Sequence, residues 1–270
     1  MKREDDESAG DRLRDIHDEL VSNPDQHGKS SSWLPLESNP EMFTSFARRV
    51  ANLSSEWSFM DVFGFDDETM RLIPRPVAAV ILLFPCTDPL YAARAVQKKS
   101  LLKLQASGRL SPAAKSALHI EQVASFGNAC GSIAAIHALS NADLSLAGRN
   151  SLLAQFKESA SHISTARERG NILVASDIHG LSDESATDNV AQTECPENGD
   201  TYLGHHYCCF VGIGGHIVEL DGTKVVPVDH GPIPNDSDLL KETARVVREV
   251  FMSVEPDRID FSLMALAKTG

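Results

Sequence analysis

The apolar residues recur with different periods along the chain, and each period predicts a type of element. Residues 42–50 carry apolar side chains at helical spacing directly after Asn39-Pro40-Glu41, which combines a capping residue, an early proline and an acid as helix starts do. Residues 77–84 form a continuous apolar run rich in β-branched side chains, typical of a strand covered on both faces. The pattern predicts further helices at about 89–106, 111–121, 131–139, 149–159 and 236–252, and further strands at 206–213, 216–221, 223–228 and 259–266. Helices between and after strands indicate a layered α/β fold.

Two of the predicted strands flank Gly214-Gly215, a strong signal for a two-residue hairpin turn. If these glycines form the turn, Asp221 lies opposite Cys208 on the paired strand. His206 shares a face with Cys208, so it is a diagonal neighbour of Asp221 at about 7 Å, within reach of a side-chain hydrogen bond. His205 points to the other face. The register therefore predicts that a carboxylate orients His206, although Asp221 with the following glycine is also an ordinary turn pair.

Cys130 lies between a turn-forming stretch and the first turn of an apolar helix. The unpaired N–H groups and the positive dipole end of a helix start favour a thiolate there, and Gly127 and Gly131 allow a close approach of the backbone. Taken alone, this cysteine is more simply read as an inert buried residue. His206 and Asp221 change that balance because they supply a base and an acid, which completes the set needed for nucleophilic catalysis.

These residues and several flanking segments together resemble the ubiquitin C-terminal hydrolase family of cysteine proteases. The similar segments are 33–41, 60–66, 73–85, 128–137, 219–222 and 261–266, which follow the order found in the family and cover about residues 33–267. The resemblance implies a papain-like core of the α+β type, with a central, mostly antiparallel sheet flanked by helices and a knotted backbone. We expect one catalytic domain over residues 31–270, preceded by a flexible acidic and polar extension over residues 1–30.

The oxyanion hole departs from the family pattern. The family has a glutamine six residues before the nucleophile, where its side chain and the cysteine N–H hold the oxyanion, but Ala124 occupies that position here. Two additional loop residues would restore the pattern with Gln122, so the resemblance assigns Gln122 to the oxyanion hole. The displaced glutamine also favours an alternative, a catalytically impaired ubiquitin-binding module of the same fold. A third class, another thiol hydrolase such as an amidase, would share the catalytic set without the segments at 33–41 and 60–85.

A long polar stretch precedes the strand that carries His206. Residues 176–201 show no clear period, and residues 192–194 resemble a motif in the crossover loop of the family. Such a loop would limit what can be threaded to Cys130. The resemblance therefore implies that the substrate is ubiquitin, or its relative Nedd8, bearing a small or unfolded group on its C-terminal glycine.

Composition and charge narrow the possible domain number, partners and location of the protein. A chain of 270 residues with 42% hydrophobic content can bury one sizeable core, and a net charge of −13 argues against nucleic acid as a partner. Five cysteines without framework spacing indicate reduced thiols. Neither a signal peptide nor a membrane-spanning run is present, so we expect no membrane partner and a cytoplasmic location, with the nucleus as the alternative. We also expect a monomer.

Other residues with potential chemistry have simpler interpretations. Cys208 and Cys209 are adjacent on a strand and point to opposite faces, so we expect no metal site, and no cofactor is expected either. His137 shares a helix face with Cys130 and is expected to be a hydrogen-bonded core histidine. Cys86 and Cys195 are expected to be incidental thiols, and residues 229–231 are given no catalytic role.

Overall fold

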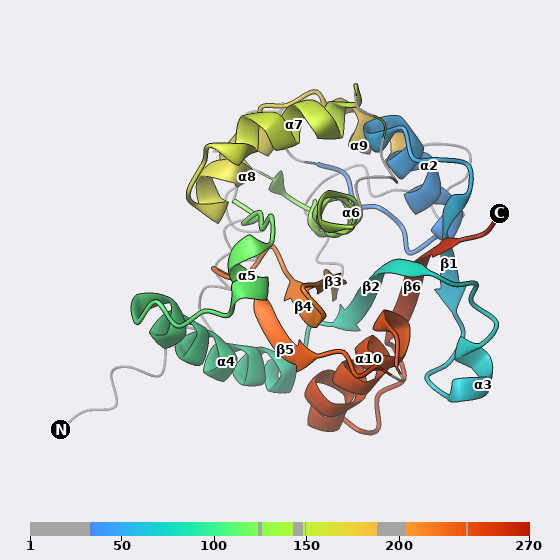
Figure 1. Ribbon diagram of the computed structural model, residues 1–270, viewed down its shortest axis with the longest axis vertical. Coiled ribbons are helices and arrows are strands. Elements are labelled where there is room, and N and C mark those ends of the chain that lie inside the picture. Colours follow the sequence, from blue (N-terminus) through green and yellow to red (C-terminus); the bar gives the residue numbers. More distant parts are fainter. Residues whose placement is uncertain (1–32, 124–125, 143–147, 149, 188–203, 236) are drawn as a thin grey trace.

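The computed structural model describes residues 33–270 except 124–125, 143–147, 149, 188–203 and 236 (Figure 1). Its centre is a six-stranded sheet with the order β1-β6-β2-β3-β4-β5, in which neighbouring strands are antiparallel. The strands are β1 (Trp57–Val62), β2 (Val77–Pro85), β3 (His205–Ile213), β4 (His216–Leu220), β5 (Val228–Pro232) and β6 (Ser262–Lys268). The predicted antiparallel sheet flanked by helices is confirmed; the knotted backbone stays a prediction.

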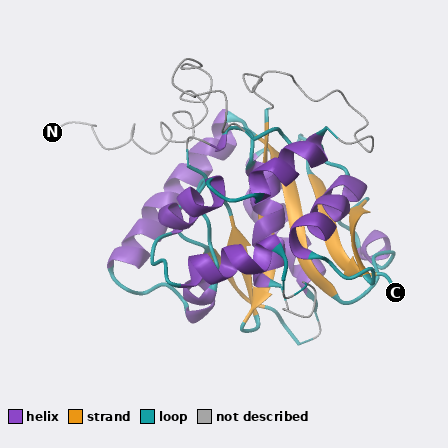
Figure 2. Ribbon diagram, turned by 90° about the horizontal axis from the view of Figure 1, so that it is seen from above, coloured by secondary structure: helices purple, strands orange, loops and turns teal. Residues whose placement is uncertain are grey.

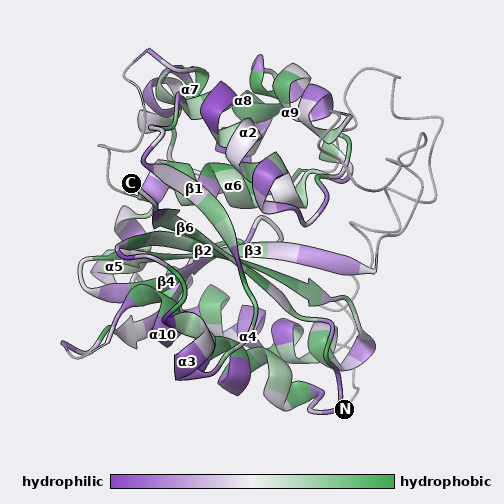
Figure 3. Cartoon of the chain, turned by 90° about the vertical axis from the view of Figure 1, so that its right-hand side faces the viewer, coloured by the Kyte–Doolittle hydropathy of each residue, from purple (hydrophilic) through white to green (hydrophobic). Residues whose placement is uncertain are grey.

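Helices cover both faces of the sheet, and Figures 2 and 3 show the strands as one layer between them. One face is covered by α2 (Pro40–Ala51), α6 (Cys130–Asn141), α7 (Leu152–Ser161), α8 (Ala166–Val174) and α9 (Ile178–Ala186). The other face is covered by α3 (Asp67–Met70), α4 (Asp88–Ala106) and α10 (Leu239–Val246), which continues into a π-helical turn η3 (Val247–Phe251) and a 3₁₀ turn η4 (Met252–Val254). The short helix α5 (Pro112–Ser116) packs beside β3, β4 and β5.

The two faces of the sheet belong to two separate apolar clusters, which explains the uninterrupted apolar run of β2. Ile81 belongs to the cluster under α2 and α6, and Leu82 belongs to the cluster under α10. Both side chains are fully buried, so the prediction of a strand covered on both faces is confirmed. Cys209 and Cys208 divide between the same two clusters, as expected for adjacent residues of a strand.

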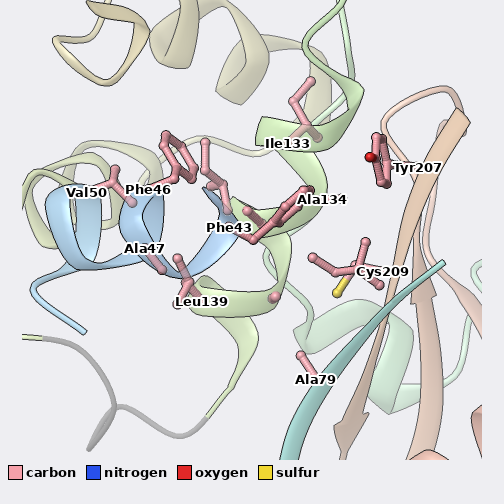
Figure 4. Packing of buried hydrophobic residues seen from close by; sticks show 14 of the residues in the cluster. Phe43, Phe46, Ala47, Val50, Ala79, Ile133, Ala134, Leu139, Tyr207 and Cys209 are labelled. Carbon is pink, nitrogen blue, oxygen red and sulfur yellow. The ribbon is translucent and has the colours of Figure 1, made fainter. Parts of the chain in front are cut away.

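The helix α6 runs through the centre of the first cluster. Every residue from 131 to 140 is buried, which is why its sequence is apolar on all sides. Figure 4 shows Ile133 and Ala134 of α6 in the same apolar cluster as Phe43 of α2 and Tyr207 of β3, whose two rings lie 5.6 Å apart. A helix held on all sides in this way gives its first residue, Cys130, a fixed position.

The predicted start of α2 is confirmed in detail. Asn39 has an extended backbone, and its side chain accepts hydrogen bonds from the N–H groups of Glu41 at 2.9 Å and Met42 at 3.4 Å. Pro40 occupies the first helical position, where the missing N–H is not needed.

Of the elements predicted between 111 and 228, one helix is shorter than expected and one strand is wrong. The helix expected at 111–121 ends at Ser116 because the Asn141 side chain binds both main-chain groups of Leu118, the N–H at 2.7 Å and the carbonyl at 2.9 Å. The strand expected at 223–228 is a turn, and β5 begins only at Val228. This turn is closed by the N–H of Lys224, which donates to the carbonyl of Asp221 at 3.0 Å. In both places side-chain or turn hydrogen bonds outweigh the local apolar pattern.

Three of the described helices, α3, α8 and α9, went unpredicted. No helix was expected at residues 166–174, where α8 forms, and α9 contradicts the expectation of a loop without secondary structure over 176–201. The buried side of α9 consists of Ile178, Ser182, Ser185 and Ala186, so serines occupy half of the positions at helical spacing that would normally be apolar. Ser182 is satisfied there by a 2.6 Å hydrogen bond with Ser132 of α6. The motif at residues 192–194, Cys195 and the extension 1–30 lie outside the described residues.

The last predicted helix is shorter than expected. The α-helical part begins at Leu239, capped by the Asp238 side chain, and ends at Val246. The wider turn that follows places Phe251 against the rings of Phe84 at 5.2 Å and Phe210 at 6.3 Å.

Candidate active site

The hairpin of β3 and β4 has the predicted register. Ile213 pairs with His216 and Cys209 with Leu220, and both turn glycines have positive φ angles, 57° and 77°. One residue beyond the ladder, the Asp221 carboxylate lies on the same side as His206. Its Oδ1 is 2.8 Å from Nε2 of His206, so the structure brings the two predicted residues into direct hydrogen-bond contact.

Cys130 is the first residue of α6, as the sequence predicts. The preceding residue Ala129 provides no side-chain cap, so the N–H groups of the first turn face the site without a side-chain acceptor. Gly127 has a φ of +61°, and the N–H of Trp33 donates to the carbonyl of Phe126 at 2.9 Å. This β-bridge of Trp33 with Gly127 fixes the loop that leads into the cysteine.

The glycine after Cys130 permits a tight approach of α6 to its neighbours. A Cβ atom at Gly131 would lie 3.2 Å from Leu36 and 3.3 Å from the ring of Tyr207. A larger residue would push the helix start away from β3. The sequence expectation that Gly131 allows a close approach is confirmed.

The ring of His206 lies between the thiol and the carboxylate. It is 5% exposed, and burial lowers the pKa of its imidazole. The charge and hydrogen bond of Asp221 outweigh that effect, and with the hydrogen bond of the Cys130 side chain they raise the pKa of His206 to about 9. Because Nε2 is used by Asp221, the other ring nitrogen is left for the thiol. The arrangement favours an imidazolium beside the Cys130 thiol.

Asp221 is almost completely buried, and its carboxylate is fully engaged. Oδ1 accepts from His206 and, at 2.8 Å each, from the N–H and hydroxyl of Thr223. Oδ2 forms a salt bridge with the guanidinium of Arg94. Burial raises the pKa of Asp221, but Arg94 and His206 outweigh it and hold the pKa well below its usual range. The acid is therefore ionised when it faces His206.

A second buried carboxylate continues this charged cluster. Glu219 forms a salt bridge with Lys224 and accepts from Nε2 of His230 at 2.8 Å. Lys224 also donates to Oε1 of Gln97 in α4 at 2.6 Å. Burial raises the pKa of Glu219, but Lys224 and His230 bring it down to about 2. The cluster therefore contains two ionised acids, with Arg94 beside Asp221 and Lys224 beside Glu219.

Arg94 and Lys224 were missed by the sequence analysis. Arg94 lies on the buried side of α4 with Leu90 and Leu101, so a charged residue at the helical spacing of an apolar stripe was the available signal. Lys224 gave no such signal, because the residues around it were read as a strand.

Gln122 is buried, but its amide is already engaged. Nε2 donates to the carbonyl of Gly127 at 2.9 Å, and the main-chain N–H donates to the carbonyl of Gly222 at 2.7 Å. Oε1 has no hydrogen-bond partner among the described residues. The side chain thus lies between the loop that leads to Cys130 and the turn that follows Asp221, and one of its two amide hydrogens remains to be used.

The histidine on α6 has the expected structural role. Nε2 of His137 accepts from the N–H of Ile120 at 2.9 Å, and its ring stacks on His119 with 5.4 Å between centroids. Burial lowers the pKa of both rings, that of His119 to about 4. His119 in turn contacts the main-chain carbonyl of Asp221 at 2.9 Å. Both histidines are therefore neutral groups behind the site.

Within the described residues, no group of three or more His, Cys, Asp and Glu side chains is arranged to hold a metal ion. Of the helices described here, none combines the length and apolarity needed to cross a membrane.

Comparison with known proteins assigns the family. A family model described as "Ubiquitin carboxyl-terminal hydrolase, family 1" matches residues 33–252. The chain belongs to this family. It is accordingly a deubiquitinating hydrolase of the cysteine peptidase type, and the resemblance of the motifs is confirmed.

Relatives match over most of their length. A probable ubiquitin carboxyl-terminal hydrolase of Dictyostelium discoideum is 33% identical, with 88% of each chain covered. The human isozyme L1 is 32% identical and covers 87% of this chain and 98% of its own. The structure resembles the UCH37 catalytic domain of Trichinella spiralis, solved with ubiquitin vinyl methyl ester, with a TM-score of 0.65 and 20% identity over 89% of this chain and 99% of that one.

Proposed function

We propose that the chain hydrolyses the bond that follows the C-terminal glycine of ubiquitin, with Cys130 as nucleophile, His206 as general base and acid, and Asp221 as the acid that orients His206. The observation that carries this proposal is the buried 2.8 Å contact of His206 with Asp221 beside a thiol at a helix start. The names of the relatives and the ubiquitin adduct of the structural neighbour support ubiquitin as the substrate.

The proposed reaction proceeds through a thioester. The Cys130 thiolate attacks the carbonyl carbon of the terminal glycine, and the tetrahedral intermediate collapses with loss of the amine, which takes its proton from His206. Water then attacks the thioester carbonyl while His206 accepts the water proton, and the thiolate leaves. Throughout, the ionised Asp221 stabilises the imidazolium.

Gln122 is proposed to hold the oxyanion together with the N–H of Cys130. Its Nε2 has one hydrogen committed to Gly127, which fixes the amide, and a second hydrogen free for a substrate oxygen. The hydrogen bond of its main chain to Gly222 ties the glutamine to the Asp221 turn. The two additional loop residues are then compatible with the family arrangement.

We expect the substitution Gln122→Ala to lower kcat for a ubiquitin amide by about 10²–10³-fold with little change in KM, because one oxyanion donor is lost. The rate of alkylation of Cys130 by iodoacetamide checks the reason, since alkylation forms no oxyanion. That rate should stay within about threefold of wild type. An equal fall in both rates would show that Gln122 only braces the cysteine loop.

The substrate range is proposed to be restricted to small or unfolded groups on the ubiquitin C-terminus. The segment 188–203 joins α9 directly to β3, whose second residue is His206, so its end is attached at the site. The sequence of residues 192–194, which resembles a motif in the crossover loop of the family, supports this restriction. Discrimination would then depend on the size of the leaving group, because the bond is the same.

The experiment compares three substrates with the purified full chain: a small fluorogenic amide of ubiquitin, the same amide of Nedd8, and a folded ubiquitin dimer. We expect hydrolysis of the ubiquitin amide at a kcat/KM at least about 10²-fold above that for the dimer. Nedd8 is the alternative substrate, and its kcat/KM is compared with that of the ubiquitin amide. Equal rates on dimer and amide would contradict the size restriction.

A ubiquitin vinyl methyl ester probe separates the classes of function. Covalent capture through Cys130 is expected for the hydrolase. Reversible binding without capture would favour a ubiquitin-binding module, and neither binding nor capture would leave another thiol hydrolase.

A further inference from the structure

Arg94 is a cation that α4 buries directly behind the proposed catalytic acid. Its side chain is 6% exposed, and its Nη2 contacts Oδ2 of Asp221 and lies 3.3 Å from the hydroxyl of Thr223. The guanidinium also lies over the ring of Phe84, 4.8 Å from its centroid, and His206 packs against the same ring with 5.5 Å between the two centroids. Arg94 therefore touches both the acid and the aromatic ring against which the base packs.

We propose that Arg94 is a positioning residue for the hydrolytic reaction, which fixes the Asp221 carboxylate so that Oδ1 faces His206. This inference rests on the proposed function. Oδ1 carries the contacts to His206 and Thr223, while Oδ2 is held by Arg94. A carboxylate clamped at both oxygens cannot rotate, so His206 keeps one orientation and one tautomer.

The way Arg94 is bonded indicates a role other than stability. Nε and Nη1 are buried without a hydrogen-bond partner among the described residues, and Nη1 is 3.9 Å from Oε1 of Glu219. A buried ion pair with unsatisfied donors contributes little net stability, and an apolar residue of similar shape often serves as well. The hydrogen bonds that Arg94 does make both go to the Asp221 turn. The hydrogen bonds of the Arg94 guanidinium therefore restrain the Asp221 carboxylate.

The charge of Arg94 predicts the direction in which its loss shifts the pKa of Asp221 and the pH dependence of activity. Several titratable or charged groups face the Asp221 carboxylate from the surrounding elements: Arg94 from α4, Cys86 after β2, His206 and Cys208 from β3, Glu219 from β4, Lys224 from the turn, His119 before α6, and Cys130 and His137 from α6. Arg94 is the strongest of the groups that lower the pKa of Asp221. Without it the carboxylate binds a proton at a higher pH and stops supporting the imidazolium. Activity in acid should therefore be lost earlier.

Lys224 provides a matched control. Its side chain is also 6% exposed and carries the same charge in the same cluster, but it binds Glu219 and Gln97 instead of Asp221. A role that depends only on buried charge would make the two cations equivalent. A positioning role makes Arg94 the more important one.

The test uses full-length R94M, R94Q, R94K and K224M, with kcat and KM for the ubiquitin amide measured from pH 5 to 9 and thermal melting as the check of folding. We expect R94M and R94Q to lower kcat at least about tenfold, with KM within about twofold. The acid limb of the kcat-against-pH profile should move up by about one pH unit in both variants. R94K keeps the charge and should restore the acid limb. K224M should lower kcat less than about threefold.

Alkylation of Cys130 by iodoacetamide against pH gives a second readout that does not need hydrolysis. The acid limb of alkylation in R94M or R94Q should move in the same direction. If the wild-type chain hydrolyses no ubiquitin amide but these limbs move, the proposed function fails and the positioning role stands. The positioning role is overturned if R94M and R94Q keep the wild-type kcat and the wild-type acid limbs of hydrolysis and alkylation. It is also overturned if K224M loses as much kcat as R94M and R94Q do.

Discussion

Replacement of Cys130 by alanine is expected to abolish hydrolysis of the ubiquitin amide, with kcat reduced on the order of 10⁴-fold or more. The thiolate is the only group of the protein that bonds to the substrate carbonyl in the proposed mechanism, and His206 cannot activate a methyl group in its place. Affinity for ubiquitin should stay within about threefold, because the substitution removes one small, partly exposed side chain. The loop that carries the cysteine keeps its contact with Trp33.

The measurement pairs single-turnover kinetics with a binding titration of ubiquitin. Cys86→Ala is the control, because Cys86 is also a partly exposed cysteine close to the site. Its thiol is raised to a pKa of about 11 by burial, so it is a poor nucleophile and its loss should change kcat by less than about threefold. Residual turnover in the Cys130 variant, or an equal loss in the Cys86 variant, would refute the assignment of the nucleophile.

The catalytic pair could be predicted because it depends on local geometry. A two-glycine turn sets the register, and the pleat then determines which side chains share a face. The pairing of His206 with Asp221 could therefore be predicted by counting residues from the turn. The position of Cys130 at a helix start is local in the same sense. The approach of α6 to β3 is not local, and the resemblance to the family supplied it.

What could not be predicted depends on contacts between distant segments. Arg94 lies 127 residues before Asp221, and only the folded chain shows that α4 brings the two together. The helix α9 was missed because its buried side contains serines, whose hydroxyl groups find a partner in α6. The end of α5 depends in the same way on Asn141, at the end of α6. In each case a polar side chain lies in a buried or partly buried position where a distant residue forms a hydrogen bond with it.

Replacement of Asp221 by asparagine is expected to have the second largest effect, a fall in kcat of about 10³–10⁴-fold. Asparagine has nearly the same shape, but its amide can donate to the imidazole where the carboxylate only accepts, so the ring is free to take the wrong tautomer. Arg94 would at the same time lose its ionic partner. The protein should still fold, since Thr223 can bond to the amide oxygen, and thermal melting checks this.

The pH dependence identifies the cause of the loss. In the wild type, Asp221 raises the pKa of His206 to about 9, so the imidazolium persists until the pH passes that value. Without the carboxylate the imidazole should lose its proton nearer its ordinary value of about 6.5, and the alkaline limb of kcat/KM should move down by roughly two pH units. Asp229→Asn is the matched control, because Asp229 binds His216 at 3.0 Å on the neighbouring strands and has no contact with His206 among the described residues. An alkaline limb that stays in place in the Asp221 variant would show that this carboxylate does not set the charge of His206.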